Sequence, residues 1–263
     1  MKVQVVGLGT VGLPTAMNAS KFLEVIGRDV DKVRQEVASK VIPVTESLVE
    51  ADAYLIDVST LADQNGNADM SAVYNVCDQV SETSPESLVS IESTVAVGTC
   101  RDIAKQFGLS NLVCCPHRFW PADPKRYGAV QMRLIGGLNK ESLKSGRNLY
   151  NLLRIPVHTV TSLEVAEIAK VVENSFRFVQ ISFAESVALI CKKKGLPFEE
   201  IRAACNTLRR KEHDYQVQVL EARRGIGGNC LPKDIRHLLD LDNSPILLGA
   251  LKTDSNYRAS LPK

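Results

Sequence analysis

The chain has 263 residues, a formal net charge of +2 and 44% hydrophobic residues. This length suits one large or two moderate domains with an ample core. The nearly balanced charge argues against a nucleic-acid or membrane partner, and no uninterrupted apolar run is long enough to span a bilayer.

The cysteine content and the first residues of the chain predict the cellular compartment of the protein. The chain has seven cysteines, an odd number, and their spacing matches no metal-ligand pattern. Cys114 and Cys115 are adjacent in an apolar run, which predicts a buried strand rather than a zinc site. A strand-like run at Lys2–Val6 opens the chain and leaves no room for a signal peptide. We therefore expect a reduced, cytoplasmic protein without a metal site.

The N-terminal stretch has the pattern of a dinucleotide-binding fold. A buried strand at Val3–Val6 leads into the glycine-rich run Gly7–Gly12, and a helix is predicted from Pro14 to Phe22. A second strand, Leu23–Gly27, ends at Arg28 and Asp29. Strand, GxGxxG, helix, strand and an acid about 20 residues further on is the required context of the fingerprint.

Each part of this fingerprint has its own physical role. Gly7 makes the tight turn, Gly9 lets a pyrophosphate approach the backbone, and Gly12 lets the helix pack on the strand. Thr10 and Val11 lie at the helix N-terminus, which supplies amides and partial positive charge to an anion.

The acid after the second strand selects the cofactor. Asp29 is expected to accept the ribose hydroxyls and to repel a 2′-phosphate, which favours NAD over NADP. Arg28 beside it leaves NADP as an alternative.

Further strands recur with the rhythm of a doubly wound sheet. Ligands of open parallel sheets bind beyond the carboxyl ends of the strands. Ser59, Thr60, Thr94 and His117 follow predicted strands and are therefore site candidates, although a hydroxyl there often only caps a helix. We predict no regular structure for residues 30–51. The strands are predicted at 53–58, 88–92, 112–115, 132–135 and 157–160.

A helical pattern runs from Leu163 to about Lys194, where Gly195 and Pro197 end it. Its length suggests a spine between a Rossmann-like NAD-binding domain at 1–160 and a small all-helical dimerisation domain at 161–263. We also expect helices at 198–206 and 234–241, and a polar C-terminal tail. The apolar stripe of the long helix consists of Val165, Ile168, Val172, Phe176, Val179, Phe183, Val187 and Ile190.

Polar residues occupy another face of this helix. Lys170, Asn174 and Arg177 are spaced i, i+4, i+7 and therefore form one row. A solvated face, with Glu173 and Arg177 as an ion pair, is the simpler interpretation of that row.

A second glycine-rich run, Gly225–Asp234, leads into Cys230. Gly227 and Gly228 let the backbone come close to a bound group. A thiol in such a loop, with the cation of Lys233 nearby, is a plausible nucleophile. In isolation, a cysteine such as Cys230 is more often a small buried apolar residue than a nucleophile.

Taken together, five stretches resemble the UDP-glucose/GDP-mannose dehydrogenase family, whose members oxidise nucleotide sugars at C6 to uronic acids. They occur in the family's order and cover nearly the whole chain, and the last two are the most specific. Two of the stretches also resemble enzymes that act on UDP-N-acetylhexosamines. The five are Gly7–Pro14, Glu92–Thr99, Pro116–Arg118, Ala166–Glu185 and Gly225–Asp234.

The resemblance implies roles for these residues. Cys230 would be the nucleophile, Lys170 and Asn174 would surround the reacting oxygen, and Asp234 with Thr94 would handle water and protons. The implied reaction transfers two hydrides to two NAD molecules through a thiohemiacetal and a thioester on the cysteine.

The chain departs from the family pattern at several points. His117 stands where the family has a glutamate, and a histidine could act as a base near neutral pH. Arg223 and Arg224 replace a Pro-Gly pair, and we hypothesise that they bind the diphosphate of a substrate, with Arg177 as a further substrate contact. The family's C-terminal nucleotide-binding domain does not follow in this sequence. Either the sequence is a fragment, or the protein functions without that domain or with a separate chain that supplies it.

Three functions stay open on the sequence. The first is a homodimeric, NAD-dependent dehydrogenase that oxidises a nucleotide sugar in two steps. The second is a two-electron 3-hydroxy-acid dehydrogenase, a related architecture with a similar lysine and asparagine. The third is an inactive NAD-binding subunit that pairs with another chain.

Overall fold

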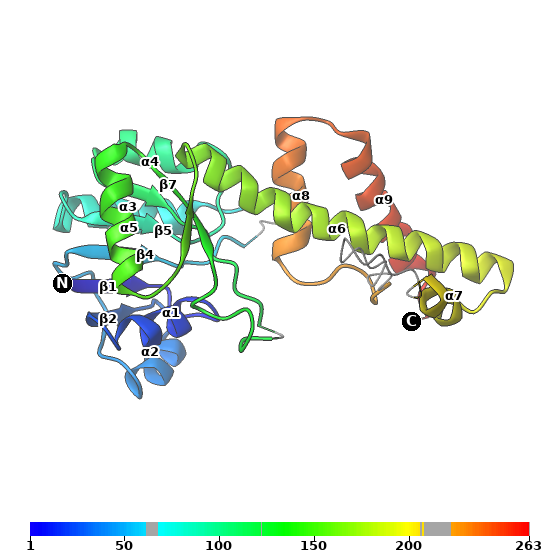
Figure 1. Cartoon of the computed structure of the whole chain (residues 1–263), viewed down its shortest axis with the longest axis horizontal. Coiled ribbons are helices and arrows are strands. Elements are labelled where there is room, and N and C mark those ends of the chain that lie inside the picture. Colours follow the sequence, from blue (N-terminus) through cyan, green and yellow to red (C-terminus); the bar gives the residue numbers. More distant parts are fainter. Residues whose placement is uncertain (62–67, 122, 206, 208–221, 263) are drawn as a thin grey trace. The chain divides into compact units, whose positions relative to one another are not determined.

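The structure is a computed structural model that describes residues 1–61, 68–121, 123–205, 207 and 222–262 (Figure 1). The chain divides into two compact units. Unit 1 comprises Met1–Thr60 and Ala68–Lys170, and unit 2 comprises Leu61–Asn67 and Val171–Lys263.

Unit 1 is built on an eight-stranded sheet with the order β3-β2-β1-β4-β5-β6-β7-β8. Neighbouring strands are parallel except β6 and β7, which are antiparallel. The order reverses at β1, which confirms the predicted doubly wound, Rossmann-like class. The strands are β1 (Lys2–Val6), β2 (Glu24–Arg28), β3 (Val44–Thr45), β4 (Ala53–Ile56), β5 (Leu88–Ile91), β6 (Leu112–Cys114), β7 (Arg133–Gly137) and β8 (Val157–Thr159).

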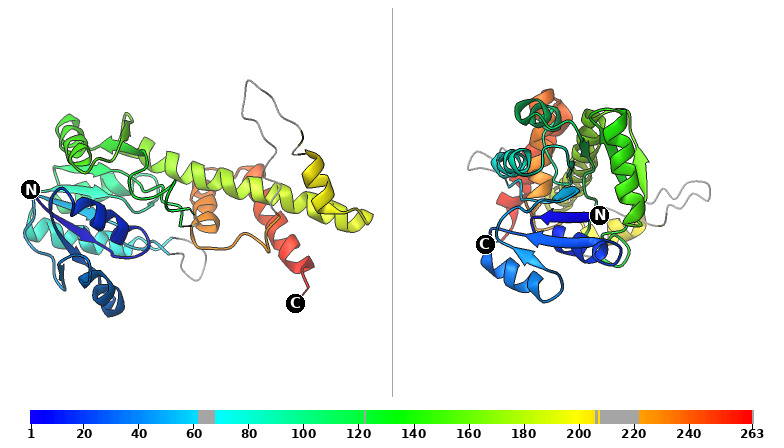
Figure 2. Two further views of the ribbon diagram at one scale, coloured as in Figure 1. Left: turned by 60° about the horizontal axis from the view of Figure 1, so that its bottom comes forward. Right: turned by 90° about the vertical axis from the view of Figure 1, so that its left-hand side faces the viewer.

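The strands are apolar on both sides because helices cover both faces of the sheet (Figures 1 and 2). In β4, Tyr54 and Ile56 join one buried cluster with α3 and α4, whereas Ala53 and Leu55 join a second cluster with α1, α2 and α5. Successive strand residues point to opposite faces, so this alternation follows from cover on both sides. The helices are α1 (Gly12–Ala19), α2 (Lys32–Ser39), α3 (Ser71–Thr83), α4 (Thr99–Phe107) and α5 (Lys140–Leu152).

All predicted strands are present, with ends that shift by one or two residues. The prediction of no regular structure for residues 30–51 was wrong, because α2 and β3 form there. The Asp31 carboxylate accepts hydrogen bonds from the amides of Val33 and Arg34 and so caps α2. Aspartate is a favoured N-cap, so this signal was available in the sequence.

The remaining helices are α6 (Leu163–Lys194), α7 (Phe198–Cys205), α8 (Cys230–Leu241) and α9 (Pro245–Ser260). The long helix is confirmed with the predicted bounds, and its residues up to Lys170 belong to unit 1. The predicted end of α7 at Asn206 lies outside the described residues. Helix α8 begins one turn earlier than predicted, at Cys230. The predicted polar tail is wrong, because α9 occupies it after a proline in its first turn.

Much of the apolar stripe of α6 faces solvent, whereas such a stripe usually faces the core. Phe176 and Phe183 are 63% and 62% exposed. The buried positions in unit 2 are instead Phe178 and Ile181, which pack with Ile226 and the residues around it. Helix α6 therefore has two apolar faces, and one of them is open to solvent in the single chain.

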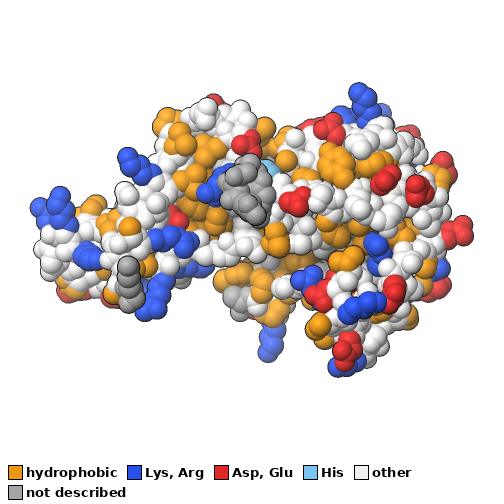
Figure 3. Space-filling view, turned by 180° about the vertical axis from the view of Figure 1, so that it is seen from behind, with side chains coloured by type: hydrophobic (Ala, Val, Ile, Leu, Met, Phe, Trp, Pro, Cys, Tyr) orange, Lys and Arg blue, Asp and Glu red, His pale blue; other side chains and the backbone are white. Residues whose placement is uncertain are grey.

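The described helices include none that is long and apolar enough to cross a membrane. Basic and acidic side chains both occur on the face drawn in Figure 3, as the net charge of +2 suggests.

Candidate active site

The glycine-rich turn between β1 and α1 has the geometry that its sequence requires. Gly7 has φ +96°, and a Cβ there would lie 2.5 Å from the carbonyl oxygen of Asp57. A Cβ on Gly12 would lie 1.8 Å from the carbonyl oxygen of Gly7. A Cβ on Gly9 would meet only the flexible side chain of Arg34, at 3.4 Å. The first and last glycines are thus fixed by packing within the chain, whereas the middle one faces space that a ligand can enter.

A cavity of about 370 Å³ opens beside this turn, at the carboxyl ends of β1, β2 and β4. This position is the crevice in which doubly wound sheets bind dinucleotides. The open backbone at Gly9, the start of α1 and an acid after β2 fit the pyrophosphate and the ribose of NAD. The lining residues are Val6, Gly7, Arg28, Asp29, Val30, Arg34, Asp57, Val58, Ser59, Ser71, Ala72, Asn75 and Val76.

Asp29 has a structural task as well as a place in this cavity. Its Oδ2 accepts a hydrogen bond from the Leu8 amide at 2.6 Å, and its Oδ1 accepts one from the Asp31 amide at 2.9 Å. The Arg34 guanidinium lies 3.7 Å from the same carboxylate. The acid thereby ties the end of β2 to the glycine turn. Arg28 also lines the cavity, and its guanidinium donates hydrogen bonds to the Glu46 carbonyl and the Gln79 side chain.

Thr10 is exposed, and Val11 is the residue that precedes the first turn of α1. Ser59 lines the cavity. The Thr60 hydroxyl donates to the carbonyl of Thr94 at 2.9 Å and so joins the ends of two neighbouring strands.

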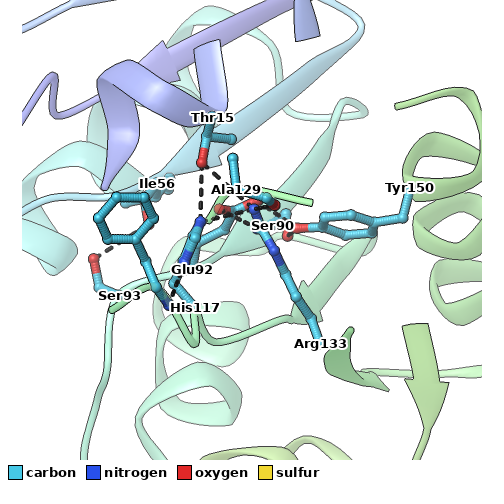
Figure 4. Close-up of polar contacts among 10 residues, drawn as sticks. Thr15, Ile56, Ser90, Glu92, Ser93, His117, Ala129, Arg133 and Tyr150 are labelled. Atoms are coloured by element: carbon cyan, nitrogen blue, oxygen red, sulfur yellow. Dashed lines mark hydrogen bonds and ion pairs between the residues drawn. The ribbon is translucent and has the colours of Figure 1, made fainter. Parts of the chain in front are cut away.

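An ion pair with no exposure to solvent lies in the middle of unit 1 (Figure 4). The Glu92 carboxylate and the Arg133 guanidinium are 2.5 Å apart, and both side chains are 0% exposed. The Tyr150 hydroxyl donates to Glu92 at 2.7 Å and lies 2.6 Å from the Ser90 hydroxyl. Arg133 also donates to the Ala129 carbonyl at 3.0 Å. A charge pair this deep is tolerable only with such surrounding hydrogen bonds.

Asp57 adds a second carboxyl group to this network. Burial raises its pKa well above the usual range, and the negative charge of Glu92 raises it further, while Arg133 opposes the shift. One positive charge thus faces two carboxyl groups. Asp57 also lines the cavity, so this group lies beside the expected NAD site.

His117 is bound into the same network. Its Nε2 lies 2.8 Å from Nη2 of Arg133 and 3.0 Å from the Thr15 hydroxyl, and its Nδ1 accepts from the Phe119 amide at 3.0 Å. N–H donors face both ring nitrogens, so a doubly protonated ring would meet a donor on each side. Burial lowers the pKa of His117 to about 2, and the charges of Arg133 and Lys170 lower it further. This environment disfavours a base near neutral pH, and the role of His117 stays a prediction.

In unit 2, a second polar cluster gathers at the start of α8. The Lys233 ammonium lies 2.8 Å from Oδ1 of Asp234, with these side chains 4% and 0% exposed. The Asn174 amide of α6 donates to Oδ2 of Asp234 at 2.5 Å. Cys230 is the first residue of α8, is exposed, and precedes Asp234 by one helical turn. The thiol, the carboxylate and the amide are therefore presented by two packed helices of one unit.

The other predicted residues lie around these two clusters. Lys170 and Arg177 are half-buried on α6, and Arg223 and Arg224 are exposed. Gly227 and Gly228 are exposed, and a Cβ at either would meet nothing within 4 Å. The backbone of this loop is open for a ligand to approach.

Sequence reasoning missed several members of both clusters. Arg133 and Glu92 lie within or beside apolar strands, and a charge in a buried strand was the available signal. Lys233 appeared as a cation near the thiol, but its pairing with Asp234 was not foreseen. His237, buried on α8, was also missed; burial lowers its pKa first, and the charge of Lys233 lowers it further.

The fold and the glycine turn define a dinucleotide-binding protein of dehydrogenase type. Residues 41–154 match the NAD binding domain of the UDP-glucose/GDP-mannose dehydrogenase family, and residues 164–247 match its central domain. The chain belongs to this family.

Similar proteins include UDP-N-acetyl-D-mannosamine dehydrogenases from Escherichia coli, 30% identical over 88% of this chain, and from Methanococcus maripaludis, 28% identical over 100% of it. The chain spans 63% and 67% of the lengths of these two proteins, respectively. The solved UDP-D-ManNAc dehydrogenase of Pyrococcus horikoshii superposes with a TM-score of 0.85 at 26% identity, covering 98% of this chain and 69% of that one.

The fold is also similar to that of 3-hydroxyisobutyrate dehydrogenase from Mycobacterium tuberculosis. The TM-score is 0.72 at 16% identity, and the match covers 98% of this chain and 94% of that one. At this identity the likeness concerns the fold alone.

Replacing Arg133 by methionine should lower the free energy of unfolding by about 3–5 kcal/mol, because Glu92 would remain buried without its partner. Urea unfolding followed by circular dichroism measures the change. The control is R101A, which removes an exposed ion pair with Glu164 and should cost at most about 1 kcal/mol. Equal losses in both variants would contradict the central role of the buried pair.

His117 should remain neutral in the folded protein, and its ring signals should not shift between pH 8 and pH 5 in an NMR titration. Its folded pKa of about 2 lies below the ordinary 6.5, so only the unfolded chain takes up a proton in that range. Stability is therefore fully present above pH 6.5 and falls as the pH drops. Relative to H117Q, the wild type should lose about 1 kcal/mol between pH 6 and pH 5.

Proposed function

We propose that the chain catalyses the NAD-dependent oxidation of the C6 alcohol of a UDP-sugar, a UDP-N-acetylhexosamine or UDP-glucose, to the uronic acid. The observation that carries the proposal is the cluster of Cys230, Asp234 and Asn174 in unit 2. An alcohol dehydrogenase that stops at the aldehyde or ketone needs no nucleophilic thiol, whereas oxidation to the acid through a thioester does. Membership of the family and the NAD binding domain support the same function.

NAD, when bound, accepts the hydride that leaves C6 in each of the two oxidations, and the hydroxyl proton lost in the same oxidation passes to water. After the first, the Cys230 sulfur adds to the carbonyl carbon of the aldehyde and forms a C–S bond. Loss of the second hydride from that carbon leaves a thioester. Water then adds to the thioester carbon, the C–S bond breaks, and the thiolate and the carboxylate product separate.

The other side chains stabilise charge and move protons in this scheme. Asn174 and Lys170, one turn apart on α6, stabilise the oxygen on which negative charge develops. Asp234 acts as the general base that takes the proton of the attacking water. In this scheme His117 stays neutral and transfers no proton, in keeping with its low pKa.

Substrate binding falls to the open loop and to basic side chains. Gly227 and Gly228 leave room for the sugar against the backbone, and Arg177 contacts the substrate. The exposed Arg223 and Arg224 suit the diphosphate.

Purified protein incubated with NAD and a panel of UDP- and GDP-sugars should form two NADH for each sugar consumed. C230S should abolish acid formation, because no thioester can form, whereas C205S should leave it unchanged. Cys205 is the matched control because it is a half-buried cysteine of the same unit, on α7.

Other stoichiometries would select the alternatives. One NADH per substrate, with an active C230S variant, identifies a two-electron 3-hydroxy-acid type dehydrogenase. Tight NAD binding without turnover of any sugar identifies an inactive NAD-binding subunit.

We also propose that the protein is a homodimer that buries the open apolar face of α6. Phe176, Phe183 and Ile190 on this face are 63%, 62% and 58% exposed, which is unusual for large apolar side chains on a single helix. A second copy of the same face would cover them in a self-complementary contact.

The double variant F176D/F183D should sediment as a monomer in analytical ultracentrifugation, whereas the wild type should sediment as a dimer. The control V33D places an aspartate at an equally exposed position of α2, where Val33 is 69% exposed, and should stay dimeric. A wild type that sediments as a monomer at every concentration would rule out this interface.

A further inference from the structure

The loop that leads to Cys230 is held at its beginning by α9. The Ile226 amide donates to Oδ1 of Asp254 at 2.7 Å, and Oδ2 of the same carboxylate accepts from the Arg258 guanidinium at 2.9 Å. Arg258 returns to donate to the Ile226 carbonyl. The backbone amide and carbonyl of Ile226 are thus both bound by the Asp254–Arg258 ion pair, whose members lie one turn apart on α9. We call this contact the α9 clamp.

The glycine before Ile226 fits this contact closely. Gly225 has φ +82°, and a Cβ there would lie 2.6 Å from Cγ of Arg258. Ile226 is 1% exposed and packs in the core of unit 2, with Phe178, Ile181 and Ile235. The loop is therefore fixed at Gly225–Ile226 and again at Cys230 by the start of α8, while the glycines between these points are open to solvent.

Glu185 of α6 touches the same ion pair. The side chain is 0% exposed, and burial raises its pKa to about 7. The negative charge of Asp254 raises this pKa further, while Arg258 lowers it, and Tyr257 is the further titratable neighbour on α9. Above pH 7, Glu185 therefore becomes a second negative charge beside Asp254, in competition for Arg258.

We propose that Asp254 and Arg258 are positioning residues that hold the Gly225–Cys230 loop so that the thiol stays in its reactive place. This inference rests on the proposed function in that it takes Cys230 as the nucleophile. The anchored peptide leaves only the short run from Gly227 to Asn229 between two fixed points. An error of about 1 Å in the position of a reacting atom is enough to cost a large factor in rate.

The first test is amide hydrogen exchange on the wild-type protein, which needs no substrate. The Ile226 amide should exchange at least about 10-fold more slowly than the exposed Gly227 and Gly228 amides, after correction for intrinsic rates. Its protection should weaken above pH 7 in the wild type and persist there in E185Q, which cannot ionise.

Kinetics then test positioning. R258A should lose the protection of Ile226 and about 100-fold in kcat, with a much smaller change in KM, because the loop is needed at the transition state. R258K, which keeps the charge facing Asp254, should recover part of kcat. The control R202A removes the Arg202–Glu199 pair, another arginine–carboxylate pair within one helix of unit 2, and should change neither quantity. If R258A does not fold, D254N and the wild-type exchange rates decide.

Rapid exchange of Ile226 in the wild type would overturn the clamp. Loss of protection in R258A with an unchanged kcat would overturn the positioning role. A protected Ile226 in a protein that oxidises no sugar nucleotide would refute the proposed function and the positioning role with it, while the clamp itself would stand.

Discussion

The ion pair between Glu92 and Arg133 holds together the elements that meet at the carboxyl ends of the central strands of unit 1. Its members follow β5 and begin β7, the strands on either side of β6. Since neither charge meets water, each must be satisfied by the protein, and the partners come from separate elements. Tyr150 belongs to α5, Thr15 to α1, and His117 follows β6. The burial of one arginine therefore fixes the relative positions of these elements at the edge where the cavity lies.

This constraint gives a physical reason for two unusual residues of the chain. Burial raises the pKa of Asp57, and the charge of Glu92 raises it further while Arg133 opposes the shift. Burial lowers the pKa of His117, and the same guanidinium lowers it further. A histidine so placed serves as a neutral spacer between Arg133 and Thr15. The reactive groups of the proposed chemistry then lie mainly in unit 2, where the thiol is exposed.

Local signals made most of the fold predictable. The glycine turn, the apolar strands and the period of α6 are each written in a short stretch, so their prediction needed no knowledge of neighbours. The candidate site was less accessible because it depends on pairing. The sequence alone shows Arg133 as a charge in an apolar strand and does not reveal its pairing with Glu92. It shows Ile226 as a loop residue and does not reveal the contact with α9. The open apolar face of α6 shows the same limit: period predicts a helix but not which of two apolar faces the chain itself buries.

Both units bury a carboxylate in the same way, since each pairs it with a cation that is itself buried. In unit 2 the cation is Lys233, the neighbour of Asp234 in the chain, 2.8 Å from its Oδ1. Side chains at i and i+1 of a helix do not normally face each other, but the long lysine stem in the first turn of α8 can bend to reach. This pairing offsets the cost of burying Asp234 and leaves its Oδ2 to hold Asn174. The amide that would stabilise the reacting oxygen is therefore oriented by the ion pair, and the ion pair is fixed by the helix whose first residue is Cys230.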